Sequence, residues 1–281
     1  MTKAIATISR TREIIEKYQI RAKKNFGQNF LVDASVAKRI AQTIPEDGVV
    51  IEIGPGIGSL TEQLAQHSSQ VIAYEVDERL LPILKEELKE YSNIKVILQD
   101  FLECDLENDL KEYGDTLYVA ANLPYYITSP VLFKLFESSL SFPIITVMMQ
   151  KEVADRFIAK PGTKEYGSIS VEGQYLYDIK RVCNAPKNAF MPAPKVDSTV
   201  LTFERKKTVV PVNDQNEFFM LIKACFKQRR KTLYNNLKDY LQDKEKAESL
   251  LKELDKPLTI RTEELSLEDF LKLYQLIEEQ A

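Results

Sequence analysis

The sequence has one histidine, three cysteines and no long apolar run in its 281 residues. Because His67 is the only histidine, a multi-histidine metal site is excluded, and His67 is the one residue that could serve as the histidine of a Ser-His-Asp triad. His67 stands at the end of a predicted helix, where we expect a capping role. Cys104, Cys183 and Cys225 are too far apart for a Cys-x-x-Cys site, so we expect buried, reduced thiols in a reducing compartment.

Long apolar segments are missing as well. No stretch approaches about 18 uninterrupted apolar residues, which argues against a membrane span. The first twenty residues carry several charges and no apolar stretch of signal-peptide length, so we expect no secretory signal and a cytoplasmic location. Hydrophobic residues make up 44% of the chain and charged residues 28%, a balance typical of globular proteins. The length predicts one large domain and a smaller one.

The net charge of −4 is unevenly distributed along the chain. Residues 1–31 hold seven Lys/Arg against two Asp/Glu, and residues 195–231 hold nine against four. Residues 239–281 hold six Lys/Arg against twelve Asp/Glu. The two basic segments are compatible with a polyanion-binding face and also with ordinary solvated surface, and charge alone leaves both open.

Strand-like and helix-like segments alternate over the first 200 residues. Helical spacing of leucines predicts helices over 59–67 and 77–91, and a further helix is predicted over 131–139. This rhythm predicts an α/β fold of the Rossmann-like type, with an open, mostly parallel sheet and helices on both faces. Residues 197–204 and the segment VCNAP are expected to add antiparallel strands. The parallel strands are predicted at 49–54, 70–76, 93–98, 116–122 and 144–150.

The pattern changes to purely helical after residue 205. A proline-containing linker precedes four helical segments, and Ser266 is the expected N-cap of the last one, with Asp269 at its third position. We therefore predict two domains: residues 1–206, an N-terminal arm plus the α/β domain, and residues 207–281, a small all-helical domain.

Glycines follow the first predicted strand in the segment EIGPGIGSL. Gly54, Gly56 and Gly58 allow a tight turn and close approach of a nucleotide-like ligand. The G-x-G-x-G spacing lacks the Lys-Ser/Thr of a P-loop, so a phosphate cradle is poorly supported. Glu75 ends the second strand and can accept hydrogen bonds from two ribose hydroxyls, and Asp100 follows the third, where it can bind an adenine amine. The alternative for the glycines alone is an ordinary strand–helix turn.

The fourth strand ends in Asn122-Leu123-Pro124-Tyr125. This segment resembles the Asn/Asp-Pro-Pro-Tyr motif of methyltransferases that act on exocyclic amines of nucleobases. The Asn122 amide oxygen and the Leu123 carbonyl can accept the two N–H bonds of such an amine, which aims the nitrogen lone pair at a methyl group. Pro124 stiffens the turn, and Tyr125 offers a ring for stacking. A purely structural turn is the alternative.

Other segments make the resemblance more specific. Residues 24–31, 150–157, 164–171 and 190–198 are similar to motifs of the ribosomal RNA adenine dimethyltransferase family, and the similarity covers nearly all of 22–205 and continues into the helical domain. The chain looks more like the small-subunit branch than the erythromycin-resistance branch. The erythromycin-resistance branch usually has Ile at the position of Leu123 and tends to have Asn at the position of Asp197.

The resemblance implies a set of functional residues. Residues matching Asn29 and Leu31 border the S-adenosylmethionine site of the family, and Phe190 would stack on the flipped adenine opposite Tyr125. Lys23 and Lys24 would lie near the catalytic mouth. The basic run at 227–231 can contact RNA phosphates through Lys227, Arg229, Arg230 and Lys231.

We therefore predict a two-domain cytoplasmic enzyme that uses S-adenosylmethionine to dimethylate two adjacent adenosines in small-subunit ribosomal RNA. By the resemblance, residues 1–206 hold the N-terminal arm and the cofactor- and adenine-binding methyltransferase domain, and residues 207–281 form the helical domain that contacts RNA. Asn122, Leu123, Pro124, Tyr125 and Phe190 form the catalytic set that the resemblance implies. Asn122 also joins Asn29, Leu31, Gly54, Gly56, Glu75 and Asp100 in the cofactor site. The sulfonium is a good leaving group, so no metal is predicted. We expect a monomer that binds rRNA within a pre-ribosomal particle and no membrane.

Three alternatives are left open by the sequence. The first is a large-subunit RNA adenine methyltransferase of the resistance type, which a map of the modified nucleotides would distinguish. The second is a noncatalytic RNA-binding assembly or transcription factor, against which the intact Asn122–Tyr125 segment and Glu75 argue. The third is a DNA adenine methyltransferase, which methylation of naked duplex DNA would reveal.

Overall fold

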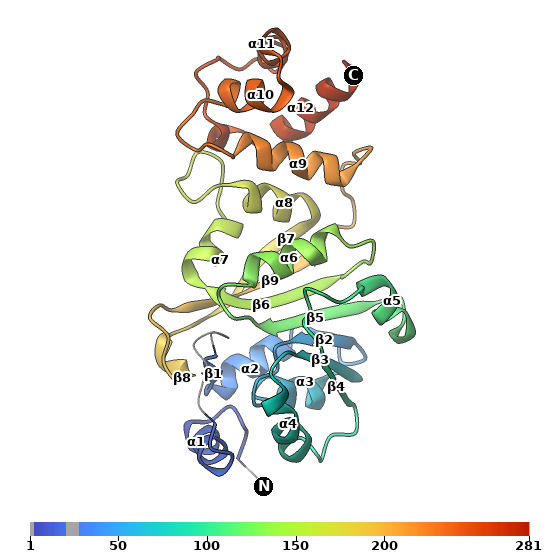
Figure 1. Ribbon diagram of the computed structural model, residues 1–281, viewed down its shortest axis with the longest axis vertical. Helices are drawn as coiled ribbons and strands as arrows, with labels where there is room; N and C mark the ends of the chain where they lie inside the picture. The colour runs from blue at the N-terminus through green and yellow to red at the C-terminus, as the bar shows by residue number, and fades with distance from the viewer. Residues whose placement is uncertain (1–2, 21–27, 281) are drawn as a thin grey trace. The chain divides into compact units, whose positions relative to one another are not determined.

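The computed structural model describes residues 3–20 and 28–280 (Figure 1). Two compact units make up the chain. The first unit comprises Met1–Ala154 and Ile179–Arg205, and the second unit comprises Asp155–Asp178 and Lys206–Ala281. The domain boundary predicted at residue 206, with its functional assignments, stays a prediction. Within the described residues, no helix has the length and apolar character that crossing a membrane requires.

A seven-stranded sheet forms the centre of the first unit, in the order β4-β3-β2-β5-β6-β9-β7. The strands from β4 to β6 run parallel, and β9 lies antiparallel to β6. The mostly parallel α/β fold predicted from the sequence is thereby confirmed. The strands are β2 (Val49–Ile53), β3 (Gln70–Glu75), β4 (Ile94–Leu98), β5 (Leu117–Asn122), β6 (Ile144–Gln150), β7 (Tyr177–Ala185) and β9 (Ser198–Arg205).

A separate two-stranded antiparallel sheet joins β1 (Phe30–Leu31) to β8 (Phe190–Met191). It pairs Leu31 with Phe190, so the end of the N-terminal arm lies beside a segment about 160 positions later in the chain. The helices of the first unit are α1 (Ile8–Lys17), α2 (Ala34–Ala41), α3 (Thr61–His67), α4 (Leu81–Glu87), α5 (Leu106–Leu110) and α6 (Thr128–Glu137), with short 3-10 turns η2 (Glu78–Leu80), η3 (Lys111–Tyr113) and η4 (Lys187–Ala189). Helix α7 (Lys151–Phe157) begins in the first unit and ends in the second.

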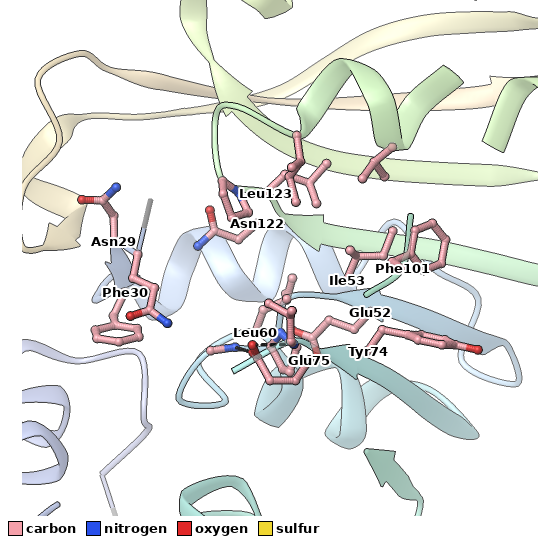
Figure 2. A pocket seen from close by; sticks show the side chains of 18 of the residues that line it. Asn29, Phe30, Glu52, Ile53, Leu60, Tyr74, Glu75, Phe101, Asn122 and Leu123 are labelled. Atoms are coloured by element: carbon pink, nitrogen blue, oxygen red, sulfur yellow. Dashed lines mark hydrogen bonds between the residues drawn. The ribbon is translucent and has the colours of Figure 1, made fainter. Parts of the chain in front are cut away.

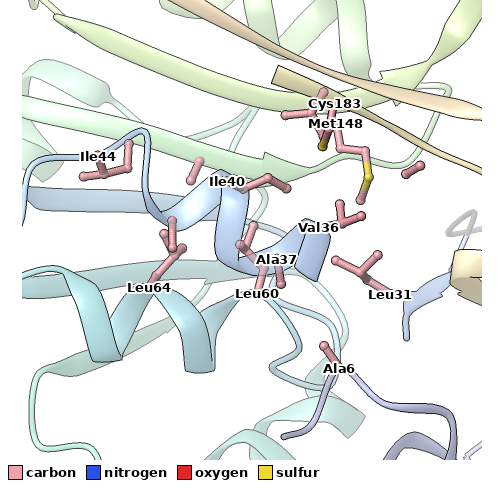
Figure 3. Packing of buried hydrophobic residues seen from close by; sticks show 14 of the residues in the cluster. Ala6, Leu31, Val36, Ala37, Ile40, Ile44, Leu60, Leu64, Met148 and Cys183 are labelled. Atoms are coloured by element: carbon pink, nitrogen blue, oxygen red, sulfur yellow. The ribbon is translucent and has the colours of Figure 1, made fainter. Parts of the chain in front are cut away.

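Both faces of the sheet are buried at its central strands, such as β2. Successive strand residues point to opposite faces, and Val50 and Ile51 of β2 are both fully buried. Val50 belongs to a cluster in which apolar residues of α2 and α3 cover one face, with Ile40 and Leu64 among them (Figure 3). The continuous apolar runs of the strands are explained by this burial on two sides.

Helix α1 is fastened to α4 through one buried carboxylate. Arg10, Lys17 and Tyr18 all donate hydrogen bonds to Glu87, whose side chain is 2% exposed. The helix predicted over 77–91 is interrupted, which corrects that range. Asp77 caps the 3-10 turn η2, and Pro82 stands in the first turn of α4, where the missing N–H is tolerated.

The second unit is helical in the part of the chain that the structure describes, apart from the first residues of β7. Aromatic residues form its core, among them Tyr175, Phe218 and Tyr274 in edge-to-face contacts. The predicted N-cap is confirmed, since Ser266 Oγ accepts from the Asp269 amide and Asp269 accepts from the Ser266 amide. Its helices are α8 (Ser168–Leu176), α9 (Gln215–Cys225), α10 (Leu233–Leu241), α11 (Lys244–Glu253), the 3-10 turn η5 (Thr262–Glu264) and α12 (Leu267–Glu279).

Candidate active site

A pocket lies at the carboxyl ends of the parallel strands (Figure 2). It is next to β2, whose two neighbours in the sheet, β3 and β5, lie on opposite sides of it. This topological switch point is the usual ligand site of an open α/β sheet. We call it the strand-end pocket. Its lining includes Gly54 after β2, Glu75 and Val76 at the end of β3, Asp100 after β4, and Asn122 to Tyr126 at the end of β5. Leu31 and Phe190 of the small sheet also line it, together with Asn29, which directly precedes β1.

The glycine loop needs the conformational freedom that the sequence predicts. Gly54 and Gly56 have φ values of 71° and 61°, which side chains rarely adopt. A Cβ built at Gly54 would meet no atom within 4 Å. Because Gly54 lines the pocket, its bare backbone leaves room for a ligand to approach closely.

Glu75 is buried, and its carboxylate holds the loop in place. Oε2 accepts a hydrogen bond from the Gly56 amide at 3.1 Å, and Oε1 accepts from the amides of Val76 and Asp77 at 2.9 and 2.8 Å. Burial raises the pKa of Glu75, although these backbone donors act in the opposite direction. Oε1 already accepts two hydrogen bonds, whereas Oε2 accepts one and keeps a second lone pair, so Glu75 can still accept from a ligand hydroxyl through Oε2.

A second buried carboxyl group, Glu52, lines the same pocket from the middle of β2. It is 1% exposed, and its Oε2 has no hydrogen-bond partner among the described residues. Burial, assisted by the nearby Glu75, raises the pKa of Glu52 to about 8. An unsatisfied buried carboxyl group is costly, so this end of the pocket suits a ligand with a hydrogen-bond donor or a positive charge.

The pocket rim near β4 combines an acid with exposed apolar groups. Asp100 is exposed and accepts from the Leu102 amide at 2.8 Å through Oδ1. Val76 and Tyr126 remain 50% and 58% exposed. Exposed apolar side chains around a pocket are typical of ligand contacts.

The Asn122–Tyr125 segment forms the turn between β5 and α6. The Pro124 carbonyl accepts from the Ile127 amide at 3.2 Å, which closes the turn. The Tyr125 hydroxyl lies 3.1 Å from the Ser198 hydroxyl, and burial raises the pKa of Tyr125. Figure 2 shows Asn122 and Leu123 on the same pocket as Glu52 and Glu75. Phe190 is 5% exposed and lines this pocket too.

The predicted RNA-binding residues fall in two groups. Lys23 and Lys24 lie outside the described residues. The second group follows α9 in the second unit and is exposed. Arg229 donates to the carbonyls of Lys164 and Tyr166, and Lys231 forms an ion pair with Asp239. These residues are Lys227, Arg229, Arg230 and Lys231.

The lone histidine and the cysteines lie apart from the pocket lining. His67 is the last residue of α3, and its Nε2 lies 2.8 Å from the Ile44 carbonyl. All three cysteines are buried and reduced. Residues 3–20 and 28–280 contain no group of three His, Cys, Asp or Glu side chains arranged to hold a metal ion.

Sequence reasoning missed Glu52, Val76 and Tyr126 in the pocket lining. Glu52 had a readable signal, because an acid in the middle of the apolar strand VVIEI is unusual unless it has a task. Val76 directly follows Glu75, so it could have been predicted to line the pocket from its position in the sequence. Tyr126 follows Tyr125, and no spacing rule separates its role from that of a surface tyrosine.

Comparisons with known proteins give a consistent result. The chain is 49% identical to the ribosomal RNA small subunit methyltransferase A of Oceanobacillus iheyensis, over 96% of this chain and 95% of that protein. It is 48% identical to the protein of the same name from Bacillus cereus strain B4264, over 96% of both.

Two solved structures have similar folds. A dimethyladenosine transferase from Plasmodium falciparum has a TM-score of 0.75 and 28% identity, and the match covers 89% of this chain and 98% of that one. The 23S rRNA methyltransferase ErmE has a TM-score of 0.67 and 26% identity, with 89% and 100% covered.

The fold and the strand-end pocket define a Rossmann-like methyltransferase. Residues 19–279 match the family model described as ribosomal RNA adenine dimethylase. The chain therefore belongs to the ribosomal RNA adenine dimethylase family, and both the family and the enzyme class predicted from the sequence are confirmed.

Proposed function

We propose that the protein transfers methyl groups from S-adenosylmethionine to the N6 amines of two adjacent adenosines in small-subunit ribosomal RNA and forms N6,N6-dimethyladenosine. One observation carries the proposal: the Asn122–Tyr125 turn, Glu75 and Phe190 line a single pocket. The names of relatives at 48–49% identity support the small subunit as the source of the RNA.

The pocket's residues fit S-adenosylmethionine. Gly54 leaves open space against its backbone, which suits close approach of the cofactor. Glu75 can accept from ribose hydroxyls, and Asp100 can accept from the adenine amine. S-adenosylmethionine is cationic at its sulfonium and its amino group, and such a positive charge nearby would favour the ionised form of Glu52, whose pKa is raised by burial. Asn29 and Leu31 line the same pocket and complete the proposed cofactor set.

Asn122 and its neighbours prepare the amine. The bound cofactor supplies a methyl group on a sulfonium, which is a good leaving group. The Asn122 amide oxygen and the Leu123 carbonyl accept the two amine hydrogens and thereby direct the nitrogen lone pair toward that methyl carbon. Tyr125 and Phe190 offer ring faces to the adenine, and stacking on such faces contributes about 1–3 kcal/mol per base.

The chemistry needs no strong base. With S-adenosylmethionine bound, the N6 lone pair would form the new bond to the methyl carbon. The carbon–sulfur bond would break, and the electron pair of that bond would stay on sulfur. The nitrogen then carries a positive charge, and its proton leaves to water. Asn122 interacts more strongly with the cationic nitrogen than with the neutral amine, so it acts on the transition state. A second round requires that the pocket readmit the monomethylated base.

The second unit supplies RNA phosphate contacts through the exposed cations Lys227 and Arg230, together with Arg229 and Lys231. Lys23 and Lys24 are proposed as further contacts. We propose that the protein acts as a monomer, in the cytoplasm, on rRNA within a pre-ribosomal particle.

The proposal is tested by mapping dimethylated adenosines in ribosomal RNA from a strain that lacks the gene and from the same strain complemented with it. We expect two adjacent dimethyladenosines in small-subunit RNA that disappear on deletion and return on complementation. Loss of the modification from large-subunit RNA instead would support the resistance-type activity. Methylation of naked duplex DNA by the purified protein would support a DNA methyltransferase, and unchanged nucleic acids would support a noncatalytic role.

A further inference from the structure

Tyr125 and Phe190 are two aromatic residues of the strand-end pocket. The segments that carry them both form hydrogen bonds with residues 197–198. Tyr125 follows β5, and Phe190 begins β8. Asp197 and Ser198 stand at the start of β9 and make one side-chain contact toward each aromatic segment. All these residues belong to the first unit.

The contact toward Phe190 is made by the Asp197 carboxylate. Its Oδ1 accepts a hydrogen bond of 2.9 Å from the Lys187 amide, which opens the short turn η4. Phe190 follows that turn directly, and the Val32 amide donates to the Ala189 carbonyl at 2.8 Å. Asp197 therefore serves this turn as an N-cap serves a helix, by accepting from a backbone donor at its start.

The contact toward Tyr125 is made by the next residue. Ser198 is 1% exposed and pairs with Gln150 of the neighbouring strand β6, so its position is fixed by the sheet. Its hydroxyl lies 3.1 Å from the Tyr125 hydroxyl. The Asp197 carbonyl also accepts from the Lys151 amide at 3.0 Å, which anchors the stretch to the end of β6.

We propose that Asp197 is a positioning residue for the methyl-transfer reaction: it fixes the turn before Phe190 relative to Ser198 and Tyr125, and so sets the spacing of the two rings that hold the adenine. This inference rests on the proposed function. Asp197 acts through its acceptor atom, so an asparagine in its place keeps the role. Asp197 does not line the strand-end pocket itself.

Four variants separate the acceptor from the charge. Asp197→Ala removes the acceptor, and Asp197→Asn keeps it. Lys187→Pro removes the donor N–H, whereas Lys187→Ala removes the same ammonium group but keeps the donor. Proline fits at 187, because Pro186 already has φ −66° and ψ 156°, the extended conformation preferred before proline, and 187 is the first residue of the turn.

The first readout is amide hydrogen exchange of residues 188–191, which keep their N–H groups in every variant, in the free protein; it needs no substrate. We expect faster exchange in Asp197→Ala and Lys187→Pro than in wild type, Asp197→Asn and Lys187→Ala. Asp115→Ala, an exposed acidic residue of the same unit, is the matched control. Equal exchange in all variants would overturn the proposal.

The second readout is single-turnover methyl transfer to small-subunit particles that lack the modification, with mono- and dimethyladenosine separated by mass spectrometry. Asp197→Ala and Lys187→Pro should be slower by about tenfold, the usual scale of a lost cap, with a larger monomethyl fraction. S-adenosylmethionine affinity should be unchanged. Asp197→Asn should stay within about threefold of wild type, since Asn and Asp cap almost equally well.

The outcomes also separate this inference from the proposed function. If Asp197→Asn is as slow as Asp197→Ala, the charge matters and the positioning role is wrong. If wild type transfers no methyl group to the particles, the proposed function is wrong, while the exchange data still decide whether Asp197 holds the turn.

Discussion

The carboxylate of Glu75 accepts a hydrogen bond from the Gly56 amide at 3.1 Å, so the end of β3 holds the glycine loop that follows β2. Glu75 thus has two tasks in the proposed cofactor site: it shapes the loop, and it offers the remaining lone pair of Oε2 to the ribose. Both depend on the same carboxylate, which is 4% exposed.

Substitution of Glu75 tests this double role. We expect Glu75→Ala to weaken S-adenosylmethionine binding by about 10- to 100-fold, since a hydrogen bond to a charged group contributes about 1.5–3 kcal/mol. The melting temperature should also fall, because three backbone donors lose their acceptor. RNA affinity should change little. Calorimetric titration with the cofactor is the measurement, and an unchanged dissociation constant would remove Glu75 from the site.

Glu52 makes stability depend on pH. Its pKa is raised to about 8 in the folded protein, from an ordinary value of 4.5. Between these two values the folded state binds more protons at this site than the unfolded state, so the contribution of Glu52 to stability falls as pH rises from about 4.5 to 8. Glu52→Gln has no such proton to lose. We expect its stability relative to wild type to improve from pH 5 to pH 8 in denaturant titrations. If the difference in unfolding free energy between Glu52→Gln and wild type is the same at pH 5 and pH 8, the raised pKa of Glu52 would be contradicted.

Arg229 and Arg230 are neighbours with different contacts. Arg229 donates to two backbone carbonyls, whereas Arg230 forms no hydrogen bond or ion pair with residues 3–20 and 28–280. We expect Arg230→Ala to reduce RNA affinity and to reduce the slope of log affinity against log salt concentration by about one. The melting temperature should be unchanged. Arg229→Ala should lower the melting temperature as well, and the double variant should flatten the salt dependence further. Filter binding across a salt series measures this, and unaltered slopes would leave the run as plain solvated surface.

Tyr126 tests the rim of the pocket. It is 58% exposed, and it lines the strand-end pocket together with Asp100. Partial burial and the negative charge of Asp100 raise the pKa of Tyr126. Because Asp100 is the proposed partner of the cofactor's adenine, we expect Tyr126→Ala to weaken binding of S-adenosylhomocysteine by about 1–3 kcal/mol, the range for base stacking. Tyr126→Phe should bind like wild type. Equal affinity of the alanine and phenylalanine variants would exclude a stacking role.

Much of the sheet and of the pocket could be predicted from local patterns. Buried parallel strands appear as short, β-branched apolar runs, and the carboxyl ends of parallel strands meet at one edge. Glu75, Asp100 and Asn122 could therefore be placed together from their positions after three strands, and all three line the pocket.

Contacts between distant segments could not be predicted in this way. Tyr125 and Ser198 are 73 positions apart, and Arg10 and Glu87 are 77 apart. A serine or an arginine has many possible partners, and only the packed chain selects one. Helix α1 was also missed, although its Thr7 cap and its amphipathic pattern were present in the sequence. Its Ile14 is buried in a cluster with Ile83 and Leu84 of α4, and a local pattern does not reveal such distant partners.

Asn122 carries the central claim, because the proposed chemistry depends on an acceptor aimed at the adenine amine. We expect Asn122→Ala to keep cofactor binding, through Glu75 and Asp100, and RNA binding, through phosphate contacts. Its rate should fall by about 10²–10³-fold, by analogy with loss of one group that stabilises a transition-state charge. The decisive measurement is single-turnover methyl transfer to unmodified small-subunit particles at saturating S-adenosylmethionine. A loss of this size with both affinities intact is the predicted result; a near wild-type rate would show that the turn is only structural and would contradict the mechanism.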